Sequence, residues 1–144
     1  MIAVDTNVLV YAHREEMPQH ERALERLTLL VEGAATWAIP VFCLGELLRV
    51  LTHPRLFEAP HTSDEACEAV ARMLGSPSLR ILTPGDRYPD LLLAAVREAR
   101  AIGNLVMDAQ IVAVCREAGV SRLLTEDRDF ARFAGFRTEN LSAA

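Results

Sequence analysis

Short apolar runs alternate with longer amphipathic stretches along this chain, and this alternation restricts its fold more than any other feature. The run Ile2-Ala3-Val4 and the later runs 36–39, 79–82 and 122–124 are short, mostly apolar and followed by turn or capping residues, as buried parallel strands are. The segments between them carry apolar residues at helical spacing. The sequence therefore predicts an α/β fold, with a mainly parallel central sheet of four or five strands flanked by helices.

The helices are expected in the segments that separate these strands. Pro18 suits the first position of a helix, because its fixed φ is helical and its missing N–H has no partner there anyway. Gly103 and Gly119 are expected to end the last two helices, since glycine readily adopts the left-handed conformation found at helix ends. The first helix is expected to begin at Val8, the others to cover 18–31, 42–51, 64–74, 88–101 and 105–118, and a last strand to lie at 136–138.

The bulk composition fits an ordinary globular protein. With 144 residues and 51% hydrophobic content, the chain is expected to form a single domain over residues 1–144 with a substantial core. No apolar run reaches the roughly 18 residues of a membrane span, and the start MIAVDTN lacks the basic region of a signal peptide. Cys43, Cys67 and Cys115 are expected to be core residues of a reducing compartment, so we expect a cytoplasmic protein without membrane contact.

Four carboxylates fall at positions that a structural role alone explains poorly. Asp5 directly follows the first strand, and Asp127 lies three residues after Leu124, the end of the fourth. Both are expected at the carboxyl edge of the sheet, where parallel α/β folds bind ligands. Glu46 and Asp108 lie in helices that are apolar around most of their circumference, so we expect both to be largely buried. Burying a carboxylate is unfavourable by several kcal/mol unless something compensates it.

Each acid also has an ordinary structural explanation. Asp5 and Asp127 would cap the segments that follow them. Glu46 would pair with Arg49 on the next turn, and Asp108 would stabilise a helix dipole. A single metal centre would explain all four carboxylates at once. Carboxylate oxygens suit Mg²⁺ or Mn²⁺, whereas a zinc site would be expected to contain histidine or cysteine. The net charge of −5 does not exclude a nucleic-acid partner, because two bound divalent ions would change it to −1.

The four acidic blocks, in this order and context, resemble the motifs of PIN-domain proteins, in particular of VapC-type toxins. Asp5-Thr6-Asn7 within segment 2–12 is similar to the family's opening motif, and Gly45-Glu46-Leu47 is similar to the second. Segments 103–111 and 123–130 resemble the third and fourth motifs. The resemblance covers nearly the whole chain and implies a PIN-like domain.

The resemblance implies a metal-dependent endoribonuclease that is the toxin of a type II toxin–antitoxin pair. It implies Mg²⁺ or Mn²⁺ as the cofactor, and as catalytic residues and metal ligands it implies Asp5, Glu46, Asp108 and Asp127. Polar neighbours are implied to orient these carboxylates, namely Thr6, Asn7, Thr125 and Asp129, although Asp129 also competes with Asp127 for the fourth position. The implied partners are an RNA substrate, a VapB-like antitoxin and a second copy of the chain in a homodimer.

Other features bear on partners and on rival functions. Three arginines near the predicted site are candidates for binding RNA phosphates, namely Arg55, Arg128 and Arg132. Segments 24–31 and 44–51 carry more apolar residues than one core face requires, as a dimer or antitoxin surface would. The alternatives are a catalytically inactive PIN-like binding scaffold, or another Mg²⁺-dependent phosphoesterase such as a phosphatase. Phosphatases of that type generally need a second Asp where this chain has Asn7, and retention of all four acids argues against the scaffold.

Overall fold

The computed structural model describes residues 1–142 and contains one five-stranded parallel sheet. Its strands lie in the order β3-β2-β1-β4-β5, so the first strand is in the centre. They are β1 (Ile2–Val4), β2 (Trp37–Pro40), β3 (Leu79–Leu82), β4 (Arg122–Leu124) and β5 (Thr138–Glu139). The predicted α/β class with a parallel sheet is confirmed.

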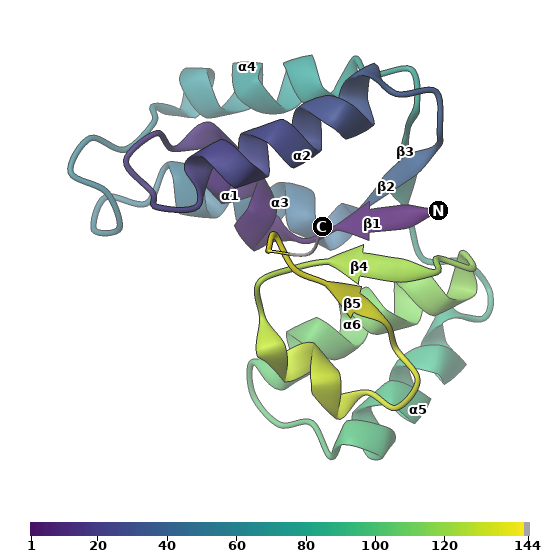
Figure 1. The fold of residues 1–144 in the computed structure, drawn as a ribbon. Helices are drawn as coiled ribbons and strands as arrows, with labels where there is room; N and C mark the ends of the chain where they lie inside the picture. The colour runs from purple at the N-terminus through teal and green to yellow at the C-terminus, as the bar shows by residue number, and fades with distance from the viewer. Residues whose placement is uncertain (143–144) are drawn as a thin grey trace.

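Two groups of helices pack around this sheet, as Figure 1 shows. The first group lies above β1 in that view and comprises α1 (Thr6–His13), α2 (His20–Glu32), α3 (Val41–Leu51) and α4 (Ser63–Leu74). The second group lies below β1 and comprises α5 (Tyr88–Ala99) and α6 (Leu105–Glu117), which pack against each other, followed by the short 3-10 helix η1 (Arg128–Arg132).

Several element boundaries differ from the sequence-based expectation, most of them by one residue. Helix α1 begins at Thr6 instead of Val8, because Asp5 caps it directly. Helix α2 begins at His20 instead of Pro18, because residues 14–20 first form turns in which Met17 N–H donates to the Arg14 carbonyl. Helix α5 ends at Ala99, since Arg100 itself adopts the left-handed conformation (φ 50°) and its N–H closes the last turn. The final strand is Thr138–Glu139, which pairs with β4 through Leu123 and Leu124.

The core is built from both sides of the central strands. All of β1 and β2 is buried, and the largest fully buried side chains are Trp37, Phe130 and Phe133. Cys43 and Cys115 are buried as expected, but Cys67 is exposed because it lies on the outer face of α4, whose buried face carries Ala66, Ala69, Val70 and Met73. Within residues 1–142, no helix combines the length and apolarity needed to cross a bilayer.

The sheet order brings opposite ends of the chain together. Strand β1 pairs in parallel with β4, with Val4 opposite Leu124. Asp5 continues this ladder, because its N–H donates to the Leu124 carbonyl at 3.0 Å. The residues that follow Val4 and Leu124 therefore leave the same edge of the sheet side by side.

Candidate metal centre

Asp5 is held rigidly at the carboxyl end of β1. The residue is only 6% exposed. Its Oδ1 accepts the Thr6 N–H at 2.8 Å, and its Oδ2 accepts the Thr125 hydroxyl at 2.7 Å and the Asn7 amide at 3.4 Å. The contact with Thr6 caps α1, so the structural explanation for Asp5, as a helix cap, is correct. The cap leaves the carboxylate in the wall of a cavity, with its orientation fixed by these hydrogen bonds.

The Thr125 hydroxyl joins the loops that follow β1 and β4. It donates to Asp5 and accepts the Asn7 side-chain amide at 3.2 Å and the Asp127 N–H at 3.0 Å. The side-chain amide oxygen of Asn7 (Oδ1) in turn accepts the Glu126 N–H at 3.2 Å. These hydrogen bonds of Thr125 and Asn7 fix Asp5 and Asp127 relative to each other.

Glu46 reaches the same cavity from α3, and its Oε2 accepts the Thr6 hydroxyl at 3.3 Å. The expectation that it would be largely buried is wrong, because Gly45, Glu46 and Arg49 lie on the open face of α3 while Cys43 and Leu47 face the core. Arg49 also lines the cavity, yet among residues 1–142 it forms no ion pair with Glu46. The expected structural pairing of these two residues is therefore absent.

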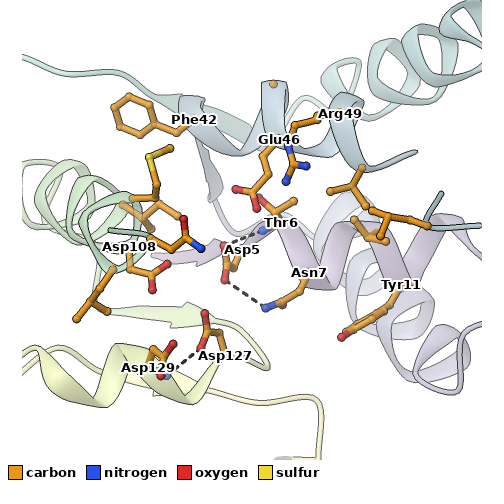
Figure 2. A pocket seen from close by; sticks show the side chains of 18 of the residues that line it. Asp5, Thr6, Asn7, Tyr11, Phe42, Glu46, Arg49, Asp108, Asp127 and Asp129 are labelled. Atoms are coloured by element: carbon orange, nitrogen blue, oxygen red, sulfur yellow. Dashed lines mark hydrogen bonds between the residues drawn. The ribbon is translucent and has the colours of Figure 1, made fainter. Parts of the chain in front are cut away.

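Three further carboxylates meet opposite Asp5 (Figure 2). Oxygens of Asp108, Asp127 and Asp129 all lie within 4.8 Å of one another. Asp108 comes from the first turn of α6 and is half-buried, so its expected burial is only partly realised. Asp127 caps η1 by accepting the Asp129 N–H at 2.9 Å. The structure brings both Asp127 and Asp129 to the cluster, and the choice between them as fourth ligand stays open.

The acids repel one another, and their pKa values show it. Burial, followed by the charges of Asp127 and Asp5, raises the pKa of Asp108 to about 7. Burial also raises the pKa of Asp5 to about 6, against the lowering effect of its hydrogen bonds from Thr125 and Thr6. Across residues 1–142, no Arg or His forms an ion pair with any acid of the cluster. The cluster is therefore a site of uncompensated negative potential.

The cavity around the acids has a volume of about 860 Å³. Its remaining wall is largely apolar and aromatic and includes Tyr11, Phe42, Leu56, Phe57, Leu105 and Met107. Of these, Leu56 and Phe57 lie in segment 53–57, which is expected from the sequence to be a loop at the substrate entrance. The predicted RNA-binding arginines Arg55, Arg128 and Arg132 are exposed but do not line it, and Arg132 donates to the Ala99 carbonyl at 3.3 Å. The arginine that does line it, Arg49, was considered from the sequence only as a partner of Glu46.

Comparison with known proteins identifies the class to which this fold and acidic cluster belong. Residues 2–136 match the family model of the PIN domain, so the chain is a member of the PIN-domain family. More narrowly, it is a relative of the VapC ribonucleases. It is 34% identical over 137 residues to a VapC ribonuclease of Mycobacterium bovis, which covers 95% of this chain and 92% of that relative. The resemblance inferred from the acidic motifs is confirmed.

Solved structures agree with this assignment. VapC20 of Mycobacterium tuberculosis, described as a toxin that cleaves the sarcin–ricin loop, has a TM-score of 0.68 at 25% identity, over 94% of this chain and 96% of that one. VapBC2 from Rickettsia felis, bound to a DNA fragment of its promoter, has a TM-score of 0.70 at 20% identity, over 97% and 98% of the two chains. The second likeness supports the fold.

Proposed function

We propose that this chain is a metal-dependent endoribonuclease that hydrolyses RNA phosphodiester bonds. The observation that carries the proposal is the convergence of five carboxylates from four separate segments on one cavity, with no cation among residues 1–142 paired to them. Burial and neighbouring charge raise the pKa values of Asp5 and Asp108 in this cluster, and a bound cation would stabilise their ionised forms. The ribonuclease names of its relatives supply the substrate class.

The donor set fits a hard divalent cation such as Mg²⁺ or Mn²⁺, because every candidate ligand is a carboxylate oxygen. The residues that would hold it are Asp5, Glu46, Asp108 and Asp127, with Asp129 beside them. A divalent ion bound there supplies Lewis-acid chemistry, by activating a water and by stabilising negative charge on the phosphate. Thr125 and Thr6 keep the carboxylates of Asp5 and Glu46 in fixed orientations before the substrate arrives.

Neutral substitutions in the cluster test the proposal. Asp108→Asn and Asp5→Asn are expected to abolish RNA cleavage in Mg²⁺ or Mn²⁺ while keeping the fold, since Asn has the shape of Asp without its charge. The products of the unaltered chain should carry 5′-phosphate and 3′-hydroxyl ends. Asp90→Asn is the matched control, because Asp90 lies in the first turn of α5 and outside the cavity. Normal cleavage by Asp108→Asn would refute the assignment.

Two rival functions are separated by direct assays. A PIN-like binding scaffold without activity need not bind metal, so calorimetric titration with Mn²⁺ should give heat only if the cluster is a metal site. A phosphatase would release phosphate from a phosphomonoester. The amide of Asn7 is engaged with Asp5, Thr125 and Glu126, so it is built into the loop and offers no second carboxylate.

We also propose that residues 1–144 form one PIN-like domain and that this domain acts on RNA in the cytoplasm. We further propose that the protein is the toxin of a type II toxin–antitoxin pair. The relatives named VapC and the toxin VapC20 support this role. A VapB-like antitoxin and a homodimer would need apolar surface, and α2 leaves Leu24 44% and Leu29 64% exposed beside a shallow groove. Light scattering on the isolated chain tests the dimer. Growth arrest on expression, relieved by the product of a neighbouring gene, tests the toxin pair.

A further inference from the structure

The connection between α3 and α4 forms one wall of the acidic cavity. Its ends are tied together, because the His61 N–H donates to the Leu51 carbonyl at 2.8 Å. The enclosed segment, residues 52–60, is therefore a compact loop of the Ω type, whose ends lie close together. Two of its apolar side chains, Leu56 and Phe57, line the cavity that contains the carboxylates.

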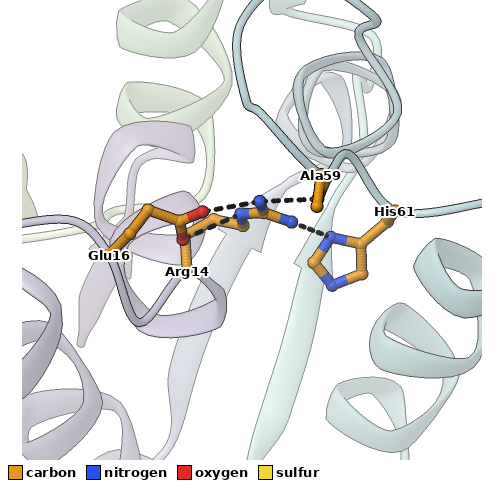
Figure 3. Close-up of polar contacts among 4 residues, drawn as sticks. All are labelled: Arg14, Glu16, Ala59 and His61. Atoms are coloured by element: carbon orange, nitrogen blue, oxygen red, sulfur yellow. Dashed lines mark hydrogen bonds and ion pairs between the residues drawn. The ribbon is translucent and has the colours of Figure 1, made fainter.

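Arg14, just after α1, fastens this loop to the rest of the molecule (Figure 3). Its side chain is only 7% exposed. Its guanidinium donates to the Ala59 carbonyl at 2.8 Å and bonds to Nδ1 of His61 at 2.7 Å. Two further bonds, at 3.1 and 2.7 Å, join Nε and Nη2 to the carboxylate of Glu16, which balances the buried charge. The guanidinium is thus nearly saturated, and its planar fork fixes one position for the loop.

The same guanidinium supports the ring of Phe57. The guanidinium carbon lies 4.1 Å from the ring centroid, so Arg14 covers one side of the ring in a cation–π contact. Phe57 is only partly buried, and it contributes to the cavity wall. On the same wall are Tyr11 from α1 and Met17 from the turn after it. An aromatic ring is therefore held at a fixed place in the wall of the cavity that contains the acidic cluster.

This wall offers contacts that the acidic cluster does not. A bound cation would attract the scissile phosphate but would not hold the bases of the RNA, so the bases must gain favourable contact with the apolar and aromatic parts of the cavity wall. Aromatic rings provide it for single-stranded RNA, because every base has a face that stacks on them. Double-stranded RNA keeps its bases stacked on one another and would not use such a ring.

We propose that Phe57 is a base-stacking residue for an unpaired nucleotide next to the cleaved bond, and that Arg14 is the positioning residue that holds Phe57 there. The proposal rests on the ribonuclease function proposed above. Arg14 itself does not touch the RNA and acts through the loop. The substrate is accordingly an RNA with at least one unstacked base beside the scissile phosphate.

The test uses a short single-stranded RNA that carries 2-aminopurine, whose fluorescence falls when the base stacks. It is titrated into the full chain carrying Asp108→Asn, which keeps the RNA intact. Binding is expected to quench the fluorescence. Phe57→Leu in that background should remove the quenching and weaken binding roughly ten- to a hundredfold, and Phe57→Trp should restore both. Unchanged quenching and affinity in Phe57→Leu would overturn the proposal.

Arg14→Met tests the positioning role, with Arg14→Lys as a milder variant that keeps the charge. Arg26→Met is the matched control, because Arg26 also forms a 2.7 Å ion pair but lies away from the cavity. With Asp108 intact, both Arg14 variants should raise KM for RNA roughly tenfold with little change in kcat, and leave Mn²⁺ affinity unchanged. An unchanged KM in Arg14→Lys, or an equal rise in Arg26→Met, would refute the positioning role.

Different results would contradict the stacking role of Phe57 and the ribonuclease function of the chain. A chain that cleaves RNA normally with Phe57→Leu contradicts the stacking proposal and leaves the ribonuclease function standing. A chain that neither cleaves nor binds RNA, even with Mn²⁺ bound, contradicts the ribonuclease function and the stacking proposal together.

Discussion

Replacing Asp108 with Asn should make the metal-free protein more stable while it removes activity. The Asp108 carboxylate is repelled by the charges of Asp127, Asp5, Asp129 and Glu46. Within residues 1–142, no group donates a hydrogen bond to it. Burial and the charges of these acids make its ionised form unfavourable in the folded chain, and Asn removes the charge while losing no hydrogen bond. The shift of its pKa from 3.8 to about 7 would correspond to roughly 4 kcal/mol in a fully buried group. Because Asp108 is partly exposed, solvent screening lowers the expected gain to about 1–2 kcal/mol.

The sign of the pH dependence follows from the raised pKa. Below pH 3.8 the Asp108 carboxyl is neutral in both the folded and the unfolded chain, so it contributes no difference. As the pH rises toward 7, the unfolded chain has released the proton and the folded chain still holds it, so the unaltered protein loses stability through this window. Asp108→Asn lacks this loss, and its advantage should grow with pH and level off above about 7.

Urea unfolding in the presence of EDTA measures this effect, at about pH 4 and about pH 8. Asp90→Asn serves as the control, since Asp90 also lies in the first turn of a helix but is exposed. That variant should be less stable by about 0.3–1 kcal/mol, because it loses a favourable interaction with the helix dipole. If Asp108→Asn were no more stable than the unaltered chain at the higher pH, burial and the neighbouring acids would not be disfavouring the ionised form of Asp108, and this support for a cation site would be lost.

Three other predictions follow from the site and its surroundings. Thr125→Val should lower the free energy of unfolding by about 1–3 kcal/mol, because Asp5 loses a donor and the Asp127 N–H loses its acceptor. The same change should lower kcat/KM for RNA roughly ten- to a hundredfold. Urea titration measures the first effect, and RNA cleavage measures the second. Calorimetric Mn²⁺ affinity should fall as the pH drops through about 7 and about 6, where Asp108 and Asp5 take up protons, and a pH-independent affinity would contradict their role as ligands. Arg100→Gly should raise stability by up to about 1 kcal/mol in thermal unfolding, since glycine adopts the left-handed backbone of this position without strain.

Much of the fold was predictable because its signals are local. Strands β1 and β4 are short apolar runs, each followed by polar turn residues, and a parallel sheet places the residues after both strands at one edge. Asp5 and Asp127 could therefore be placed together before the structure was known. The five-stranded order, by contrast, depends on which strands pair, and no local pattern determines that.

The parts that the sequence did not predict depend on distant contacts. Glu46 lies in an apolar helix, but the way α3 packs turns its Gly45–Glu46 side to the cavity. Arg14 stands in the run Arg14-Glu15-Glu16, which looks like solvated surface, and it is buried only because Ala59 and His61 reach it from across the fold. Phe57 acquires its position from that contact in turn.

The pairing of Asp5 with Thr125 has a consequence for the life of the protein in the cell. These residues stand 120 positions apart, and strand β4 and Asp127 belong to the last quarter of the polypeptide. A ribosome must therefore release nearly the entire product before the two halves of the centre can meet. Unfinished or C-terminally truncated products would lack β4 and Asp127, so they would carry only part of the acidic site.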